Sequence, residues 1–296
     1  SDRSSARADG LAAMMKSAKK EWPQINIKHI HFDSYPHEEQ ELADTVAREF
    51  AEPAHQVVRF RHGVREIPVL KEIEEASDSG RDQFDNSSIV VAIGGAKGIT
   101  YSLVKNLSEQ YGVVLHIMGR SLASDEHVVE AMKLLEQTAS SVTYHSVDAT
   151  DYNSLSEVVS GIVNDNSATA TDRDSSSPDE QKWIDLLING TGVELSSQLI
   201  NKTVEDIEYE LKGNTMPAIN TIELAKQFRP KRTLNFTSII GMFGNSGQTA
   251  YAYSKATVDR LTQRAKQQGL DITSLQWPPW DGVGMTSQKA ILGMLK

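Results

Sequence analysis

The pattern of apolar and polar residues changes character near residue 88. Beyond this point, short runs of apolar, mostly β-branched residues alternate with stretches of helical periodicity. Continuous apolar runs are typical of strands that are buried on both faces of a parallel sheet, with helices in the crossover connections. The expected strands cover residues 89–93, 113–118, 142–147, 183–188, 233–236 and 274–277, and the expected helices cover about 100–111, 125–138, 155–163, 204–228 and the stretch after 249. The alternation predicts an α/β fold with a doubly wound parallel sheet.

The preceding residues predict a smaller β-α-β-β unit. It comprises a helix over 11–22 ended by Pro23, a strand over 25–32, a helix over 37–51, and two strands over 56–60 and 65–70 that flank a hairpin at His62-Gly63. The unit has no glycine-rich phosphate turn and no catalytic cluster. We therefore predict a structural subdomain without a cofactor site over residues 1–80 and a catalytic subdomain over 81–296, joined by a Ser/Asp-rich linker at 76–88.

Composition narrows the class of protein further. The 296 residues are 39% hydrophobic and 24% charged, as in an ordinary globular protein, and the net charge of −10 argues against a nucleic-acid binder. The absence of cysteine excludes disulfides and thiolate metal sites. No apolar run is long enough to span a membrane and no signal peptide is evident, so we expect a cytoplasmic location. Because the sequence starts at Ser1, we expect a processed chain or an excised piece of a longer one.

Two histidines could suggest a metal site. His29 and His31 are spaced to share one side of the first expected strand, but no acidic or histidine partners accompany them in the sequence. We interpret them as part of a solvated strand face and predict no metal site.

A glycine-rich turn follows the first buried strand of the second half. The sequence GGAKGIT starts at Gly94 and leads directly into a helical stretch. Gly94 and Gly98 allow a tight turn, and the helix N-terminus offers free N–H groups to a pyrophosphate. The context of strand, turn and helix predicts a dinucleotide site of Rossmann type. Its expected phosphate-binding residues are Gly94, Gly95, Ala96, Lys97, Gly98 and Ile99.

The ends of the following strands indicate which dinucleotide is bound. Arg120 and Ser121 follow the second strand, where an acidic residue would hold a free ribose 2′-hydroxyl and an arginine suits the 2′-phosphate of NADP. With Lys97 nearby, we predict NADPH in preference to NADH. Asp148 and Ala149 are expected to meet the adenine. The remaining expected cofactor contacts, near the nicotinamide and its ribose, are Asn189, Gly190, Thr191, Tyr251, Lys255 and Pro279.

The stretch NFTSIIGMFGNSGQTAYAYSK holds the candidate chemistry. Ser238 ends an expected strand, and Tyr251 and Lys255 are i and i+4 neighbours on an expected helix. A cation one turn away is expected to lower the pKa of the phenol and to make Tyr251 a proton donor. Tyr-x-x-x-Lys also occurs by chance in helices, so its context carries the prediction. Pro217 is expected to break its helix locally and to leave Asn214 free to bond water or a side chain.

These residues together resemble the short-chain dehydrogenase/reductase family. GGAKGIT, GRS, FGNSGQTAYA and WPPWDGVGM, with KSAKKEWPQINIKHIHFD near the start, are similar to the ketoreductase domains of type I polyketide synthases and polyunsaturated fatty acid synthases. The resemblance covers nearly the whole chain. It implies that the first part is a truncated, Rossmann-like structural subdomain. It also implies a catalytic set of Ser238, Tyr251, Lys255 and Asn214, the last holding a water that relays protons to Lys255.

The chain departs from the modular ketoreductases at several positions. Those enzymes usually have lysine where this chain has Asn214 and asparagine where it has Lys255, whereas the order here is that of stand-alone ketoacyl reductases. Thr100 replaces the last glycine of the cofactor turn, which resembles the fatty-acid-synthase-like branch. The Leu-Asp-Asp marker after residues 189–192 is absent, and Phe243 replaces a diagnostic tryptophan.

The function that the resemblance implies is reduction of a β-ketoacyl thioester, carried by an acyl carrier protein, with NADPH. The implied partners are that carrier protein and neighbouring synthase domains, and self-association is left open. The alternatives are a stand-alone reductase of small ketones, a non-catalytic structural domain, and a nucleotide-sugar epimerase or dehydratase. The Gly-x-x-x-Gly turn and the WPPW ending argue against the epimerase or dehydratase.

We also expect an exposed insertion at residues 164–180 and a lid at 282–296.

Overall fold

The computed structural model describes residues 2–34, 38–52, 54–72, 84–169 and 184–280. Most of the predicted linker, most of the predicted insertion and the whole predicted lid lie outside these residues. Within them, no helix is both long and apolar enough to cross a membrane, and no group of three or more histidine or acidic side chains could hold a metal ion.

The larger sheet contains six parallel strands in the order β6-β5-β4-β7-β8-β9. The strands are β4 (Ile89–Ile93), β5 (Val114–Gly119), β6 (Ser141–Ser146), β7 (Leu186–Asn189), β8 (Arg232–Ser238) and β9 (Ile272–Trp277). The chain winds outward from β4 in one direction and then returns to wind outward from β7 in the other. Ligands of such sheets bind at this reversal, beside the carboxyl ends of β4 and β7. The predicted doubly wound Rossmann-type fold is confirmed.

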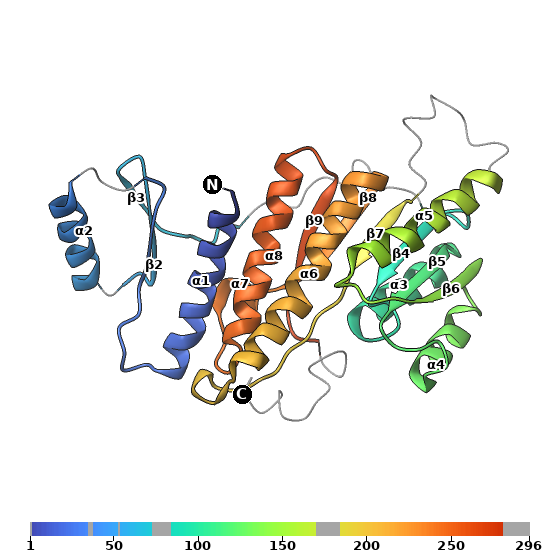
Figure 1. Cartoon of the computed structure of the whole chain (residues 1–296), viewed down its shortest axis with the longest axis horizontal. Coiled ribbons are helices and arrows are strands. Elements are labelled where there is room, and N and C mark those ends of the chain that lie inside the picture. Colours follow the sequence, from blue (N-terminus) through green and yellow to red (C-terminus); the bar gives the residue numbers. More distant parts are fainter. Residues whose placement is uncertain (1, 35–37, 53, 73–83, 170–183, 281–296) are drawn as a thin grey trace.

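Helices cover both faces of this sheet (Figure 1). They are α3 (Gly98–Tyr111), α4 (Glu126–Leu135), α5 (Tyr152–Thr169), α6 (Val204–Phe228), the short α7 (Ile240–Phe243) and α8 (Thr249–Gln267). Every residue of β4 is buried, and successive side chains enter opposite cores. Val91 packs with residues of α5 and α6, whereas Val90 packs with residues of α3 and α4. This two-sided burial explains why the strand is apolar throughout.

A smaller sheet lies at the other end of the molecule. Strand β1 (His29–Phe32) pairs in parallel with β2 (Val57–Arg61), which pairs antiparallel with β3 (Val64–Glu66), and helix α2 (Glu39–Ala51) lies beside them. His62 and Gly63 have φ values of 49° and 76°, as a two-residue hairpin turn of the primed type requires. The predicted hairpin is therefore confirmed, although β1 and β3 are shorter than expected.

Helix α1 (Asp2–Glu21) lies between the small sheet and α8 (Figure 1). It begins well before the expected residue 11. Ala13 packs against Ala252 and Ala256 of α8, and a Cβ added to Gly10 would lie 2.5 Å from the Thr257 hydroxyl oxygen. Small residues on α1 thus allow close approach of the two helices. The boundary between two subdomains at residue 80 stays a prediction. Helix α1 belongs to the first of these predicted subdomains, but it makes its main contacts with α8 in the second.

Candidate active site

Three predicted catalytic residues come together where β8 meets α8. Ser238 is the last residue of β8, and Tyr251 and Lys255 lie in the first two turns of α8. All three are buried, with Tyr251 only 5% exposed. The Ser238 hydroxyl donates to the Trp277 carbonyl at 3.4 Å and lies near enough to Tyr251 to act on its pKa, and the Lys255 ammonium lies 5.5 Å from the centre of the Tyr251 ring. Two hydroxyl-bearing side chains and one cation are thus buried together where β8 meets α8.

Lys255 connects the catalytic helix to the sheet. Its ammonium donates hydrogen bonds to the carbonyl oxygens of Phe236 on β8, at 3.2 Å, and Thr191 after β7, at 3.5 Å. Burial disfavours the charged form and lowers the pKa of Lys255 to about 8. This lysine therefore lies close to its titration point at neutral pH.

The pKa of Tyr251 corrects one prediction. Lys255 was expected to lower it, yet the pKa is raised above its ordinary value. Burial of the phenol is the largest cause, the negative charges of Glu194 and Glu210 add to it, and the neighbouring Ser238 hydroxyl opposes it. Desolvation dominates because the phenol is buried, and the two carboxylates act in the same direction. Tyr251 is thus held protonated at neutral pH, which suits a proton donor.

Asn214 corrects a second prediction. Helix α6 continues through Pro217, because its packing against β7 and α8 outweighs the hydrogen bond that proline removes. Asn214 is buried, and its amide group donates to the carbonyl oxygens of Val193, at 2.8 Å, and Glu210, at 2.7 Å. Its oxygen accepts from the Val193 N–H at 3.3 Å. The side chain therefore holds the segment after β7 without any break in the helix. Its oxygen and the Lys255 ammonium both lie beside Gly192, at 3.2 and 3.3 Å from a Cβ added there, so the water relay between them stays a prediction.

The glycine-rich turn lies against the end of β7. Gly94 has a φ of 84°, and a Cβ added there would lie 3.2 Å from the backbone of Gly190 and Thr191. A Cβ on Gly190 would lie only 1.8 Å from the hydroxyl oxygen of Thr100 on α3. Both glycines are thus needed for the turn after β4 to pack against the end of β7. Such a turn fits a dinucleotide, because its backbone N–H groups can approach a pyrophosphate without hindrance from side chains.

The other predicted cofactor residues lie along the same sheet edge. Arg120 and Ser121 follow β5, Asp148 and Ala149 follow β6, and the exposed Lys97 immediately precedes α3. Two of these positions are fixed by hydrogen bonds, since the Ser121 carbonyl accepts from the Tyr144 hydroxyl at 2.9 Å and the Ala149 carbonyl accepts from the Asn220 amide at 2.9 Å. Pro279 follows β9, next to the paired rings of Trp277 and Trp280.

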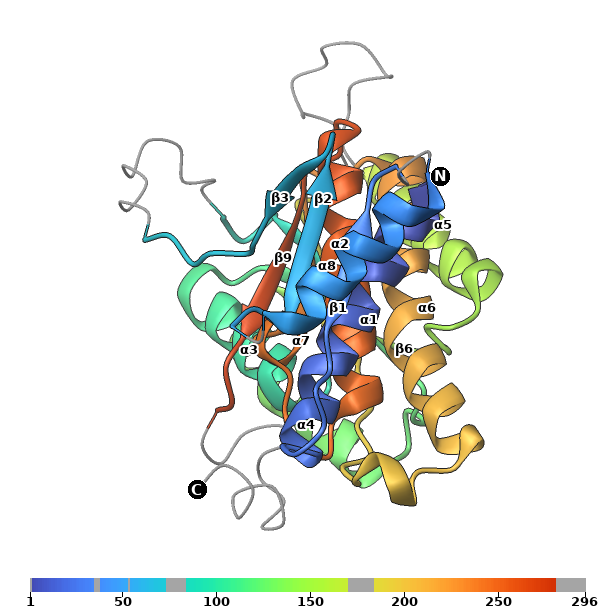
Figure 2. The same ribbon diagram turned by 90° about the vertical axis from the view of Figure 1, so that its left-hand side faces the viewer.

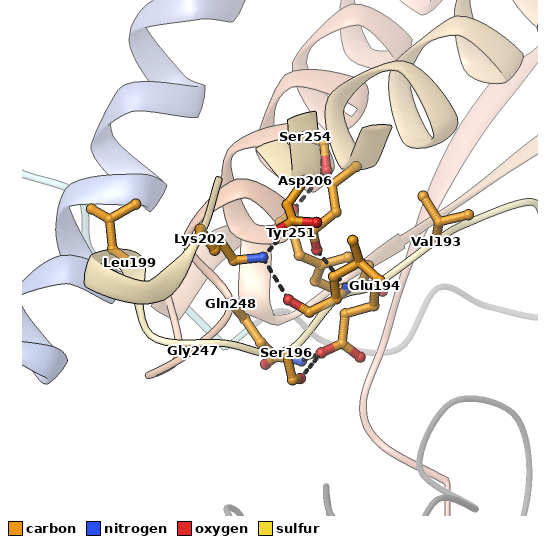
Figure 3. Close-up of polar contacts among 12 residues, drawn as sticks. Val193, Glu194, Ser196, Leu199, Lys202, Asp206, Gly247, Gln248, Tyr251 and Ser254 are labelled. Carbon is orange, nitrogen blue, oxygen red and sulfur yellow. Dashed lines mark hydrogen bonds and ion pairs between the residues drawn. The ribbon is translucent and has the colours of Figure 1, made fainter. Parts of the chain in front are cut away.

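Sequence reasoning missed a polar cluster in the segment that follows β7 (Figure 3). One Glu194 oxygen accepts from the Gln248 amide at 2.6 Å and from the Ser196 hydroxyl. Gln248 immediately precedes α8, so this contact joins the two segments beside Tyr251. The signal available in the sequence was a pair of polar residues, Glu210 and Asn214, at i and i+4 on the inner face of α6.

An ion pair within this cluster is completely enclosed. The side chains of Lys202 and Glu210 are both 0% exposed. Glu210 also accepts from the Leu195 N–H at 2.9 Å, and Lys202 donates to the Leu195 carbonyl at 2.5 Å. Burial raises the pKa of Glu210. Both backbone polar groups of Leu195 are thus bonded to one buried pair, which fixes the segment that carries Glu194.

A family model described as KR domain matches residues 88–282. Polyketide synthase PksN of Bacillus subtilis (strain 168) is 24% identical over 289 residues, which are 93% of this chain and 5% of that protein. 3-oxoacyl-[acyl-carrier-protein] reductase FabG of Thermotoga maritima is 27% identical over 146 residues, covering 47% of this chain and 52% of FabG. Among solved structures, a ketoreductase domain from the bacillaene assembly line has a TM-score of 0.79 at 20% identity, covering 98% of this chain and 67% of that one.

The fold and the glycine-rich turn at its strand reversal define a Rossmann-type dinucleotide-binding protein. With the match over residues 88–282, the chain belongs to the KR domain family. The resemblance predicted from the sequence is therefore confirmed. The chain spans about a twentieth of the length of PksN.

Proposed function

We propose that this chain is a β-ketoacyl reductase, which reduces the β-carbonyl of an acyl thioester to a hydroxyl group with NADPH. The thioester is carried by an acyl carrier protein, in polyketide or polyunsaturated fatty acid biosynthesis. One observation carries the proposal: Ser238, Tyr251 and Lys255 are buried together where β8 meets α8, at the sheet edge that also carries the glycine-rich turn after β4.

The cofactor is held by the residues at the carboxyl ends of the strands. The turn from Gly94 to Ile99 contacts the pyrophosphate, and Lys97 and Arg120 bind the 2′-phosphate. When bound, NADPH supplies the hydride that reduces the carbonyl carbon. Lys255 would bind the nicotinamide ribose, and its ammonium is positioned by its hydrogen bonds to the carbonyls of Thr191 and Phe236.

The protein supplies the proton. Ser238 and Tyr251 both donate hydrogen bonds to the β-carbonyl oxygen, which orients the substrate and polarises the C=O bond. As hydride reaches the carbon, the Tyr251 hydroxyl transfers its proton to the oxygen. The raised pKa of Tyr251 keeps this proton in place until negative charge develops on the substrate. Lys255 then stabilises the tyrosinate that remains.

Two features support a carrier-bound thioester. PksN and FabG are, by their names, a polyketide synthase and a reductase of carrier-bound 3-oxoacyl groups. The matches to PksN and the bacillaene ketoreductase also include the small N-terminal sheet, since they cover 93% and 98% of this chain. A stand-alone reductase of small ketones has no need of that additional unit.

The proposal is tested with Tyr251→Phe. Turnover is followed as loss of NADPH absorbance with an acetoacetyl N-acetylcysteamine thioester. We expect the variant to lose about 10²- to 10⁴-fold in kcat, the usual contribution of a general acid, and to keep its affinity for NADPH. Tyr253→Phe is the matched control, because this residue is two positions away on α8 and lines a cavity with Met14 and Leu211.

Three outcomes separate the alternatives. Turnover that prefers NADPH over NADH and disappears only in Tyr251→Phe supports the reductase. Full turnover in Tyr251→Phe contradicts the assignment of the proton donor. NADPH binding without turnover, with the thioester presented both free and on a carrier protein, would indicate a structural domain.

A further inference from the structure

We propose that Glu21, the last residue of α1, is a positioning residue for the reaction, because it holds together the two segments that flank Tyr251. The inference rests on the proposed reductase function. It assigns a role to the KSAKKE segment at the end of α1, which contains none of the predicted catalytic or cofactor residues.

The Glu21 carboxylate accepts one backbone hydrogen bond from each segment. One oxygen accepts from the Gly247 N–H at 2.9 Å, and the other accepts from the Leu199 N–H at 2.7 Å. Gly247 lies in the loop between Ser238 and Tyr251, one residue before Gln248. Leu199 begins the short helix η2 (Leu199–Asn201) in the segment that follows β7. A single carboxylate thus bridges segments that are far apart in the sequence, as its two acceptor oxygens allow.

The rest of α1 supports the same loop. The Ser17 hydroxyl accepts from the Asn245 N–H at 3.0 Å, and the ammonium groups of Lys16 and Lys20 donate to the carbonyls of Met242 and Gly244, each at 2.7 Å. A Cβ added to Gly244 would lie 2.6 Å from the Ser17 nitrogen. The loop therefore lies directly on the helix, and α1 holds it from residue 242 to residue 247.

The Glu21 bridge lies next to the contacts that reach the catalytic tyrosine. The Ser197 N–H donates to the Gly247 carbonyl at 2.9 Å, and Gln248 donates to Glu194, whose charge acts on Tyr251 (Figure 3). Figure 2 shows α1 running alongside α8, which carries Tyr251. Loss of the bridge would let Gly247 and Leu199 separate and would change the distance between Glu194 and Tyr251. The cofactor residues at the ends of β4, β5 and β6 have no contact with Glu21 among the described hydrogen bonds.

The test is Glu21→Gln in the full chain. Glutamine keeps the size of the side chain, but it replaces one acceptor oxygen by an NH₂ group that cannot accept from a backbone N–H. We expect kcat for the thioester to fall about 10- to 100-fold, the scale of a small misplacement of catalytic groups, with the Kd for NADPH unchanged. Glu39→Gln is the matched control, because it makes the same change at an exposed position in the first turn of α2.

Amide hydrogen exchange provides a readout that needs no substrate. Exchange should accelerate in Glu21→Gln at Gly247 or Leu199, whichever amide loses its acceptor oxygen, and it should stay unchanged at both amides in Glu39→Gln. Wild-type kcat in Glu21→Gln, or unchanged exchange at both amides, would overturn the proposal. So would a loss of kcat accompanied by an equal loss of NADPH affinity and of melting temperature, because that pattern indicates a merely structural role. Absence of turnover in the wild-type chain would overturn the reductase function, while exchange would still decide whether Glu21 bridges the two segments.

Discussion

At the scale of single residues, Lys255 sets the expected pH dependence. Its pKa is lowered to about 8 by burial, whereas the pKa of Tyr251 is raised. Of these two groups, only Lys255 loses a proton just above neutral pH. The site then loses the positive charge that stabilises the tyrosinate. We expect kcat/KM for NADPH, which reports the groups of the free protein, to fall as the pH rises through about 8. A profile that stays flat to about pH 10, with the fold intact by circular dichroism, would contradict this assignment.

Arg120 leads to a prediction about the choice of cofactor. Its exposed guanidinium follows β5, at the sheet edge where a ribose would lie. A charge-assisted hydrogen bond contributes about 1.5–3 kcal/mol, so Arg120→Gln should raise the KM for NADPH about 10- to 100-fold. The KM for NADH should stay unchanged, because NADH has no 2′-phosphate. Lys133→Gln removes a charge from an exposed position on α4 and serves as the control. An equal effect on both cofactors would contradict a 2′-phosphate contact.

The candidate site also shows which residues a sequence can reveal. Ser238, Tyr251 and Lys255 are close in the chain, so their spacing on a strand and a helix was enough to predict that they meet. The contacts of Glu194 with Gln248 and of Glu21 with Gly247 join residues far apart in the sequence. Local periodicity contains no information on such pairs. The direction of the Tyr251 pKa depends on the same distant carboxylates and on burial, and the prediction from Lys255 alone was wrong for that reason.

At the scale of elements, the predicted bounds were most accurate for two elements that line the core of the larger sheet. The fully buried β4 has the expected bounds, and so does α6, even though Pro217 lies within it. Residues 2–10 of α1 and residues 164–169 of α5 are largely polar, and there the helices extend beyond their expected limits. Polar stretches lack the apolar period by which a helix is recognised. The first turns of α1 are instead supported by α8, as the close approach at Gly10 shows.

At the scale of the whole molecule, α1 makes the two halves interdependent. The small sheet follows α1 in sequence and lies on its far side from α8, while Lys16, Lys20 and Glu21 of α1 contact the stretch between Ser238 and Tyr251. The N-terminal residues therefore contribute contacts beside Tyr251, although none of the predicted cofactor residues lies among them.

The stability of the small sheet should depend on pH through Glu49 of α2. Its buried carboxylate accepts from Arg65, at 2.5 and 3.1 Å, and pairs with Lys28 at 2.7 Å. The hydrogen bond from Arg65, followed by the contact with Lys28, lowers the pKa of Glu49 to about 2. A lowered pKa in the folded state stabilises the protein above the pKa of the unfolded state, about 4.3, and this stabilisation disappears as the pH falls towards 2.

Glu49→Gln should therefore destabilise the fold at pH 7 and have little effect near pH 2. At neutral pH the variant leaves Lys28 and Arg65 without their buried partner, at a cost of up to about 3 kcal/mol by linkage. Near pH 2 the wild-type carboxyl is itself becoming neutral, so the two proteins should converge. Urea unfolding at several pH values, with Glu39→Gln as the control on the same helix, measures the difference. A destabilisation that is equal at both pH values would show that Glu49 acts through packing, because packing does not titrate.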